Sequence, residues 1–231
     1  MAPAIKNLLL ECYRLATGQD LTSRCEAVAL PLHTVLYQPG SRPRYVHLLT
    51  SGLASIVCFM QGGEGVEVGM VGRESFPEAV YLLGPQITAR QGIMQVGGTG
   101  LRMRFKDFEE EFLKNTALRT LVMRSIQCEA MTLSQLVACN ALHLVEKRLA
   151  RWLLMVQART GESDLPLTQE FLGQMLGARR SSVTLAAGNL QRAGMIEYHR
   201  GNVRIECRER LAETACECAG IIQELLDNIY R

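Results

Sequence analysis

The 231-residue chain has little net charge and no long apolar run, and each shortage excludes a class of protein. A formal charge of +2 at pH 7 argues against a polycation that binds acidic partners over its whole surface. No apolar stretch is long enough to span a bilayer, and Glu11 interrupts the early leucine run as no signal peptide would. We therefore expect a cytoplasmic protein without membrane contact.

Histidines are too few and too scattered for a metal enzyme. His33 and His47 fall in the first half of the chain, whereas His143 and His199 lie far from them. Cupin chemistry needs two or three histidines and a carboxylate around one metal. A nucleophile motif and a phosphate-binding glycine loop are also missing. We expect no enzyme, and a cupin-type barrel enzyme fused to a DNA-binding tail stays as a weaker alternative.

The eight cysteines contain no CxxC pair, which is the usual sign of a metal or redox site. Cys216 and Cys218 form the only close pair, and Cys218 falls on an apolar helical stripe. A disulfide scaffold is not expected in a chain of this length without a secretion signal. We interpret the cysteines as buried structural thiols, with a cluster or redox sensor as the alternative, and assign no metal.

Short apolar alternations separated by glycine and proline fill residues 25–105, after a short amphipathic helix over residues 4–16. One example is the set Val66, Val68 and Met70. Many short strands at regular spacing predict a β jelly-roll barrel, with one short helix or turn over residues 74–84.

Residues 101–160 contain neither glycine nor proline, which predicts helices. A short helix over 107–114 should precede a long one that begins at the Asn115 cap and continues towards Cys139. The long helix is apolar over a wide arc, so we expect the barrel to cover one side and the same helix of a partner subunit the other. Burial within a monomer stays open as the alternative. The positions assigned to this dimer helix are Leu118, Val122, Met123, Ser125, Ile126 and Leu133.

Asn140 is a candidate cap for a new helix over residues 141–159, which places a hinge at 139–143. An apolar stripe from Leu211 to Ile229 predicts one terminal amphipathic helix.

Residues 168–204 show the pattern of helix, tight turn, helix and hairpin. Thr168 is a suitable N-cap, and Gly177 suits a left-handed turn. The second helix should run from Arg179 to Arg192, followed by a hairpin with residues 200–202 at its tip. This order is typical of a winged helix-turn-helix.

The exposed side of this unit suits DNA. Seven arginines against three acids give residues 179–210 a charge of +4, while the rest of the chain is negative. Arginine can pair with guanine, and serine or threonine with bases or phosphates. A helical hairpin that only packs is the alternative. The assigned DNA-binding residues are Thr168, Gln169, Arg179, Arg180, Ser181, Ser182, Thr184, Arg200 and Asn202.

The expected fold class is therefore α+β. We divide the chain into an effector or sensor barrel with its N-terminal helix (1–114), a long dimerisation helix (115–139), and a winged helix-turn-helix domain with a terminal helix (140–231).

This order resembles the Crp/Fnr family of bacterial transcription regulators over nearly the whole chain. Residues 148–150 and 167–198 carry the most specific likeness, and segments 37–40, 48–52 and 71–74 a looser one. The resemblance implies a cyclic-nucleotide-binding-like barrel, a homodimer on a palindromic site in double-stranded promoter DNA, contact with RNA polymerase, and a signal passed from barrel to DNA-binding heads.

The chain departs from this family at the sites that matter most. Leu185 stands where a second base-reading arginine often is, so we expect a different operator. At the effector site, Glu74 follows an inserted arginine and Arg90 stands in a changed motif. Both could bind a cyclic nucleotide or other small ligand, but a surface ion pair or solvated charges is the favoured interpretation.

Other cofactors of the family are not supported by motif. Cys12 and Cys25 are too far apart to copy an iron–sulfur pattern, and His33 and His47 are haem-ligand candidates by residue type only. We therefore predict no cofactor, and leave the effector unidentified or absent.

Overall fold

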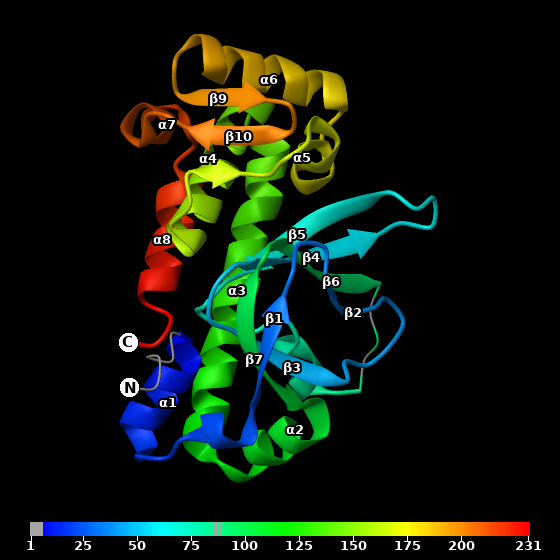
Figure 1. Cartoon of the computed structure of the whole chain (residues 1–231), viewed down its shortest axis with the longest axis vertical. Helices are drawn as coiled ribbons and strands as arrows, with labels where there is room; N and C mark the ends of the chain where they lie inside the picture. Colours follow the sequence, from blue (N-terminus) through cyan, green and yellow to red (C-terminus); the bar gives the residue numbers. More distant parts are fainter. Residues whose placement is uncertain (1–6, 86, 88) are drawn as a thin grey trace.

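The computed structural model describes residues 7–85, 87 and 89–231, and it confirms the α+β class (Figure 1). Two antiparallel sheets form the N-terminal half, a long helix runs along them, and a helical head with a small sheet follows. The N-terminal helix α1 spans Leu8–Thr17, and residues 4–6 of the expected helix lie outside the described part. Among the described residues, no helix is both long and apolar enough to cross a membrane.

The expected strands are present as two sheets with the orders β1-β7-β3 and β2-β6-β4-β5. The alternation at Val66, Val68 and Met70 lies on β5 as expected, where these three residues are half-buried and Glu67, Gly69 and Val71 are buried. The strands are β1 Glu26–Leu30, β2 Val35–Tyr37, β3 Tyr45–Leu49, β4 Leu53–Phe59, β5 Gly65–Val71, β6 Arg90–Val96 and β7 Gly98–Arg104.

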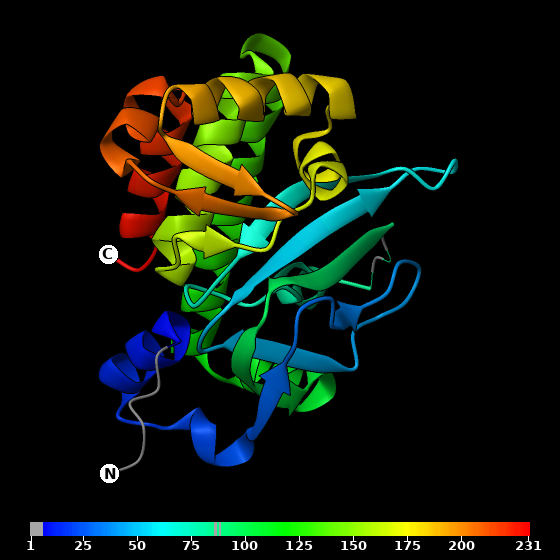
Figure 2. The same ribbon diagram turned by 45° about the horizontal axis from the view of Figure 1, so that its top comes forward.

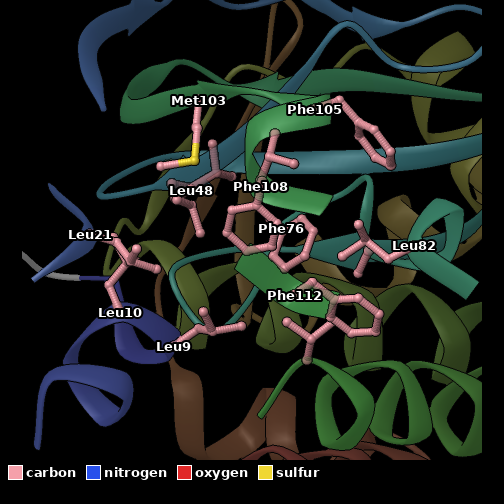
Figure 3. Close-up of a cluster of buried hydrophobic side chains, with 14 of the residues drawn as sticks. Leu9, Leu10, Leu21, Leu48, Phe76, Leu82, Met103, Phe105, Phe108 and Phe112 are labelled. Carbon is pink, nitrogen blue, oxygen red and sulfur yellow. The ribbon is translucent and has the colours of Figure 1, made fainter. Parts of the chain in front are cut away.

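The barrel core lies between the sheets and helices α1, α2 (Phe105–Lys114) and α3 (Thr116–Leu142). Figure 3 shows the rings of Phe76, Phe108 and Phe112 gathered in this core. The first two meet edge to face with their centroids 5.1 Å apart, a favourable geometry for aromatic pairs. Two 3-10 turns, η1 (Leu21–Arg24) and η2 (Ala79–Leu83), complete the domain, and η2 lies within the expected 74–84 segment.

The long helix begins as expected but ends later. The Asn115 side chain accepts hydrogen bonds from the first free N–H groups of α3. The expected end at Cys139 and the cap at Asn140 were wrong, because α3 continues to Leu142 and Asn140 is an exposed residue within it. Asparagine, alanine and leucine at 140–142 all tolerate helical geometry, and the chain turns extended only at His143. Leu144 then precedes α4, Val145–Thr160.

The prediction of a single terminal helix was also wrong, because the chain forms two helices there with a break at residues 215–217. Ala215 adopts an extended conformation (φ −62°, ψ 156°), which redirects the chain and lets α8 lie along α3. The head consists of β8 Asp164–Leu165, α5 Gln169–Leu176, α6 Arg180–Arg192, β9 Ile196–His199, β10 Asn202–Ile205, α7 Arg208–Thr214 and α8 Cys218–Asp227.

Barrel and head share a second hydrophobic core. Leu53, Val57 and Val96 of the barrel pack with buried residues of α4, α5 and α6. Both views place α5 beside β5, with α6 on the outer side of the head (Figures 1 and 2). The division at residues 114 and 139 remains a prediction.

Candidate DNA-binding surface and effector site

The first helix of the helix-turn-helix forms as its sequence predicts. The Thr168 hydroxyl accepts a hydrogen bond from the Phe171 N–H at 3.1 Å and caps α5. Gly177 ends the helix with φ +55°, a left-handed conformation that costs glycine little. Leu172, Met175 and Leu176 are buried and fix α5 against the head.

Helix α6 presents one apolar and one polar face. Val183, Ala187 and Leu190 are buried in the shared core. The opposite face carries the predicted contact residues, of which Ser182 is half-buried and the others are exposed; these are Arg179, Arg180, Ser181 and Thr184. Leu185, which the prediction omitted, is also 64% exposed on this helix.

The wing is a tight hairpin between β9 and β10. Arg200 and Gly201 both have positive φ (46° and 82°), as a two-residue type I′ turn requires. This geometry leaves the side chains of Arg200 and Asn202 exposed. Arg204 further along is paired with Asp164 at 2.7 Å, so part of the positive charge is neutralised locally.

Two contacts join the wing, α5 and α6 into one surface. The Thr184 hydroxyl lies 2.8 Å from Gln169 Oε1, which links the N-terminal turns of α6 and α5. A Cβ atom built on Gly201 would lie 3.5 Å from Thr168 Cγ2, so the wing turn sits beside the start of α5. The N-terminal turns of α5 and α6 and the wing turn therefore lie side by side on the head, with the exposed arginines Arg179, Arg180 and Arg200 on the α6 and wing parts.

The two effector candidates are both engaged in ion pairs with the helices. Glu74 Oε1 accepts from Arg159 Nε of α4 at 2.9 Å, with both side chains largely buried. Arg90 donates to Glu129 of α3. The cavity beside Glu74 has a volume of only 40 Å³, which is room for about one water molecule. A larger hollow of 720 Å³ lies at β1–β3, and neither candidate lines it.

A buried carboxylate that the sequence did not reveal joins β5 to α4. Trp152 Nε1 donates to Glu67 Oε1 at 2.8 Å, and Ser55 Oγ donates to Oε2 at 2.6 Å. Burial raises the pKa of Glu67 to about 7, although these hydrogen bonds and the nearby Arg151 and Arg159 oppose the shift. The sequence could have indicated that Glu67 is buried only if it had shown which face of strand β5 points into the core.

The six predicted dimer-helix residues do not share one environment. Leu118, Val122 and Ser125 are buried within the chain. Met123 and Leu133 are exposed at 53% and 38%, and Ile126 is half-buried. The outward stripe continues to Val137, which is 64% exposed. Only the second group can meet another molecule.

One group of possible metal ligands was missed. Cys139, His143, Cys216 and Cys218 meet where α3, α4 and α8 approach one another, with ligand atoms within 4.8 Å of one another. The sequence showed only two weak signals, Cys-x-Cys and Cys-x₃-His, 77 residues apart.

Comparison with known proteins supports both the head and the overall fold. Residues 147–214 match the family model of the Crp-like helix-turn-helix domain. A search of curated protein sequences finds no match.

Solved structures of similar fold are regulators. A crp/fnr-family transcriptional regulator from Eubacterium rectale superposes with a TM-score of 0.71 at 15% identity, covering 88% of this chain and 98% of its own. FixK2 from Bradyrhizobium japonicum superposes with a TM-score of 0.68 at 12% identity, and the match covers 83% of this chain and 98% of FixK2. The c-di-GMP responsive global regulator CLP from Xanthomonas campestris superposes with a TM-score of 0.65 at 15% identity, and the match covers 80% of this chain and 95% of CLP.

A winged helix-turn-helix head of this type is a DNA-binding unit. The C-terminal domain belongs to the Crp-like helix-turn-helix family, and the chain as a whole shares the fold of Crp/Fnr regulators.

Proposed function

We propose that the chain acts in the cytoplasm as a homodimer that binds a palindromic site in double-stranded promoter DNA. The observation that carries this proposal is helix α6, whose apolar face is buried while Arg180, Ser181 and Thr184 are exposed. A recognition helix enters the major groove with its N-terminal residues against base edges. Two-fold symmetry would place the two half-sites about one helical turn apart.

Arg180 is our candidate for base recognition, because an exposed guanidinium at the first residue of α6 can pair bidentately with guanine. Leu185 offers an apolar contact to a thymine methyl group. Arg200 at the wing tip suits a phosphate, which positions the head without reading sequence. Thr168 and Gln169 complete the surface beside it.

The outward stripe of α3, from Met123 to Val137, supports a second copy of α3 as the dimer partner. Exposed apolar residues at this spacing suit a coiled-coil contact. Leu118, Val122 and Ser125 are left out of this interface because the chain already covers them.

The ion pairs of Glu74 and Arg90 support a structural role for both residues and a regulator whose effector is unidentified or absent. Gating by a cyclic nucleotide or other small ligand is the alternative, and it requires that ligand binding break one of these pairs. Contact with RNA polymerase and the absence of catalytic activity belong to the same proposal.

The test is a binding selection on random duplexes with purified protein, followed by affinity measurements on the enriched site. We expect a palindrome, and Arg180→Ala should weaken binding to it by roughly 1–3 kcal/mol while binding to random DNA changes less. Arg14→Ala on the distant helix α1 is the matched control and should change neither. No enrichment, with or without added cyclic nucleotide, would contradict the proposal.

A further inference from the structure

The hinge between the long helix and the head carries four sulfur and nitrogen ligands that DNA binding does not use. Cys139 lies in the last turn of α3, and His143 is the residue where that helix ends. Cys216 lies in the break between α7 and α8, and Cys218 begins α8. The three cysteines are almost completely buried and form a small cluster of their own.

The distances within this cluster match a tetrahedral metal site. Around one zinc ion, bond lengths of about 2.3 Å to sulfur and 2.0–2.1 Å to nitrogen place two sulfurs about 3.8 Å apart and a sulfur and a nitrogen about 3.6 Å apart. Cys139 Sγ and Cys216 Sγ are 3.5 Å apart, and Cys218 Sγ is 3.6 Å from His143 Nδ1. We propose that Cys139, His143, Cys216 and Cys218 bind one Zn²⁺ ion as a closed Cys₃His site.

The second ring nitrogen of His143 has the partner that such a site requires. Its Nε2 lies 3.3 Å from a carboxylate oxygen of Glu217. A ligating histidine usually donates its other N–H to a carboxylate or carbonyl, which fixes the tautomer and orients the ring. Glu217 stands between two of the cysteine ligands in the sequence, so the same short segment supplies both ligands and support. Gln135 Nε2 donates to Cys218 Sγ at 3.2 Å, so a second side chain holds this sulfur in place.

Buried positive charge lies beside the cluster. Arg148 and Arg151 of α4 are buried and interact electrostatically with Cys139 and Cys216. Within the described part of the chain, the Nε atoms of both arginines have no hydrogen-bond partner, and neither guanidinium forms an ion pair. Three thiolates with Zn²⁺ and a neutral histidine carry a net charge of −1, which compensates part of this buried positive charge.

A single ion fits better than the two other chemistries open to these residues. Ligand atoms that all lie within 4.8 Å of one another surround one metal, whereas an iron–sulfur cluster spreads its ligands over several iron atoms. A disulfide between Cys139 and Cys216 would use two of the four groups and leave Cys218 and His143 without a role.

Metal at this position would connect α3 to the segment before α8 at the point where α4 and the head begin. Its effect on DNA binding rests on the proposed function, whereas the metal site itself does not. The ion would add metal–ligand bonds between the end of α3 and the break between α7 and α8, where the cysteines already pack together.

The test uses the full-length reduced protein, stripped of metal with a chelator and titrated with Co²⁺ and then Zn²⁺. We expect the visible absorption of tetrahedral cobalt–thiolate coordination to saturate at one equivalent and to disappear on addition of one equivalent of Zn²⁺. Freshly purified protein should contain close to one zinc per chain by elemental analysis. A folded protein that gives no saturable cobalt spectrum, or that contains a Cys139–Cys216 disulfide and no zinc, would overturn the proposal.

Variants then locate the site. Cys218→Ser should abolish the cobalt–thiolate absorption at one equivalent, whereas Cys58→Ser on β4 is the matched control and should leave it unchanged. Glu217→Gln keeps all four ligands and should weaken Zn²⁺ binding by about 10- to 100-fold. Equal losses in Cys218→Ser and Cys58→Ser would contradict this location. DNA affinity is measured separately, so that metal uptake without DNA binding refutes the proposed function and leaves the metal site standing.

Discussion

The buried carboxylate of Glu67 gives the sharpest stability prediction, because the neutral isostere Glu67→Gln removes its charge and keeps its shape. The amide oxygen of glutamine can still accept from Trp152 Nε1. The amide group can donate to Ser55 Oγ, which then donates to Gln95. The substitution therefore tests the cost of the charge and not the loss of the hydrogen bonds.

The size and direction of the effect follow from the pKa. Burial raises the pKa of Glu67 from its ordinary value of 4.5 to about 7 in the folded state. Between these values the folded state holds a proton that the unfolded state has lost, so the free energy of unfolding falls as the pH rises. The difference between the folded and unfolded pKa values corresponds to about 3 kcal/mol in the free energy of unfolding. The wild type loses this stability as the pH rises to 7 and above, whereas Glu67→Gln, which cannot ionise, keeps it.

The assay is urea unfolding between pH 4 and 9, followed by fluorescence of Trp152. This is the only tryptophan in the chain, and it contacts Glu67 directly. We expect wild type and Glu67→Gln to be nearly equal at pH 4, and the variant to be more stable by up to about 3 kcal/mol at pH 8. Glu64→Gln on the exposed β4–β5 hairpin is the matched control and should follow the wild type at every pH.

A difference between Glu67→Gln and wild type that stays constant with pH would refute this reasoning. So would a wild type that becomes more stable than the variant as the pH rises, because Glu67 would then ionise more readily in the folded state than in the unfolded one.

Three further perturbations test the connections between the parts. Arg159→Met should cost roughly 3–5 kcal/mol in urea unfolding because it leaves the largely buried Glu74 unpaired, and adding Glu74→Gln should recover much of this loss. Val137→Glu should shift the proposed dimer to monomer in sedimentation without loss of helix, whereas Leu118→Ala should lower stability by roughly 2–5 kcal/mol and leave association intact. Gly177→Ala should cost about 1 kcal/mol in thermal unfolding because φ is +55° there; an unchanged melting temperature would contradict this.

Local signals predicted the helix-turn-helix well because its determinants are close in sequence. A threonine cap, a glycine turn and a two-residue hairpin each act over a few residues, and all three form as expected. The helix ends near Asn140 and Ala215 were missed because the residues there tolerate more than one conformation. Packing of α8 along α3 decides where the chain turns.

The candidate sites likewise differ in how far apart their residues lie in the sequence. Predicted DNA-binding residues come together because they lie within 35 residues of one another on elements that a single domain positions. Glu74 and Arg90 could not be assigned from sequence, because their partners Arg159 and Glu129 lie on helices far along the chain. The cysteine–histidine group was missed for the same reason, since Cys139 and Cys216 are 77 residues apart.

Helix α4 is the element through which barrel and hinge can both act on the head. On the barrel side, Glu67 and Glu74 hold Trp152 and Arg159. On the hinge side, the proposed metal site lies beside Arg148 and Arg151 of the same helix. The buried face of α4 packs in the same core as the buried face of α6, which carries the recognition surface. Both Glu67 and the proposed metal site therefore contact the same helix that supports the recognition surface.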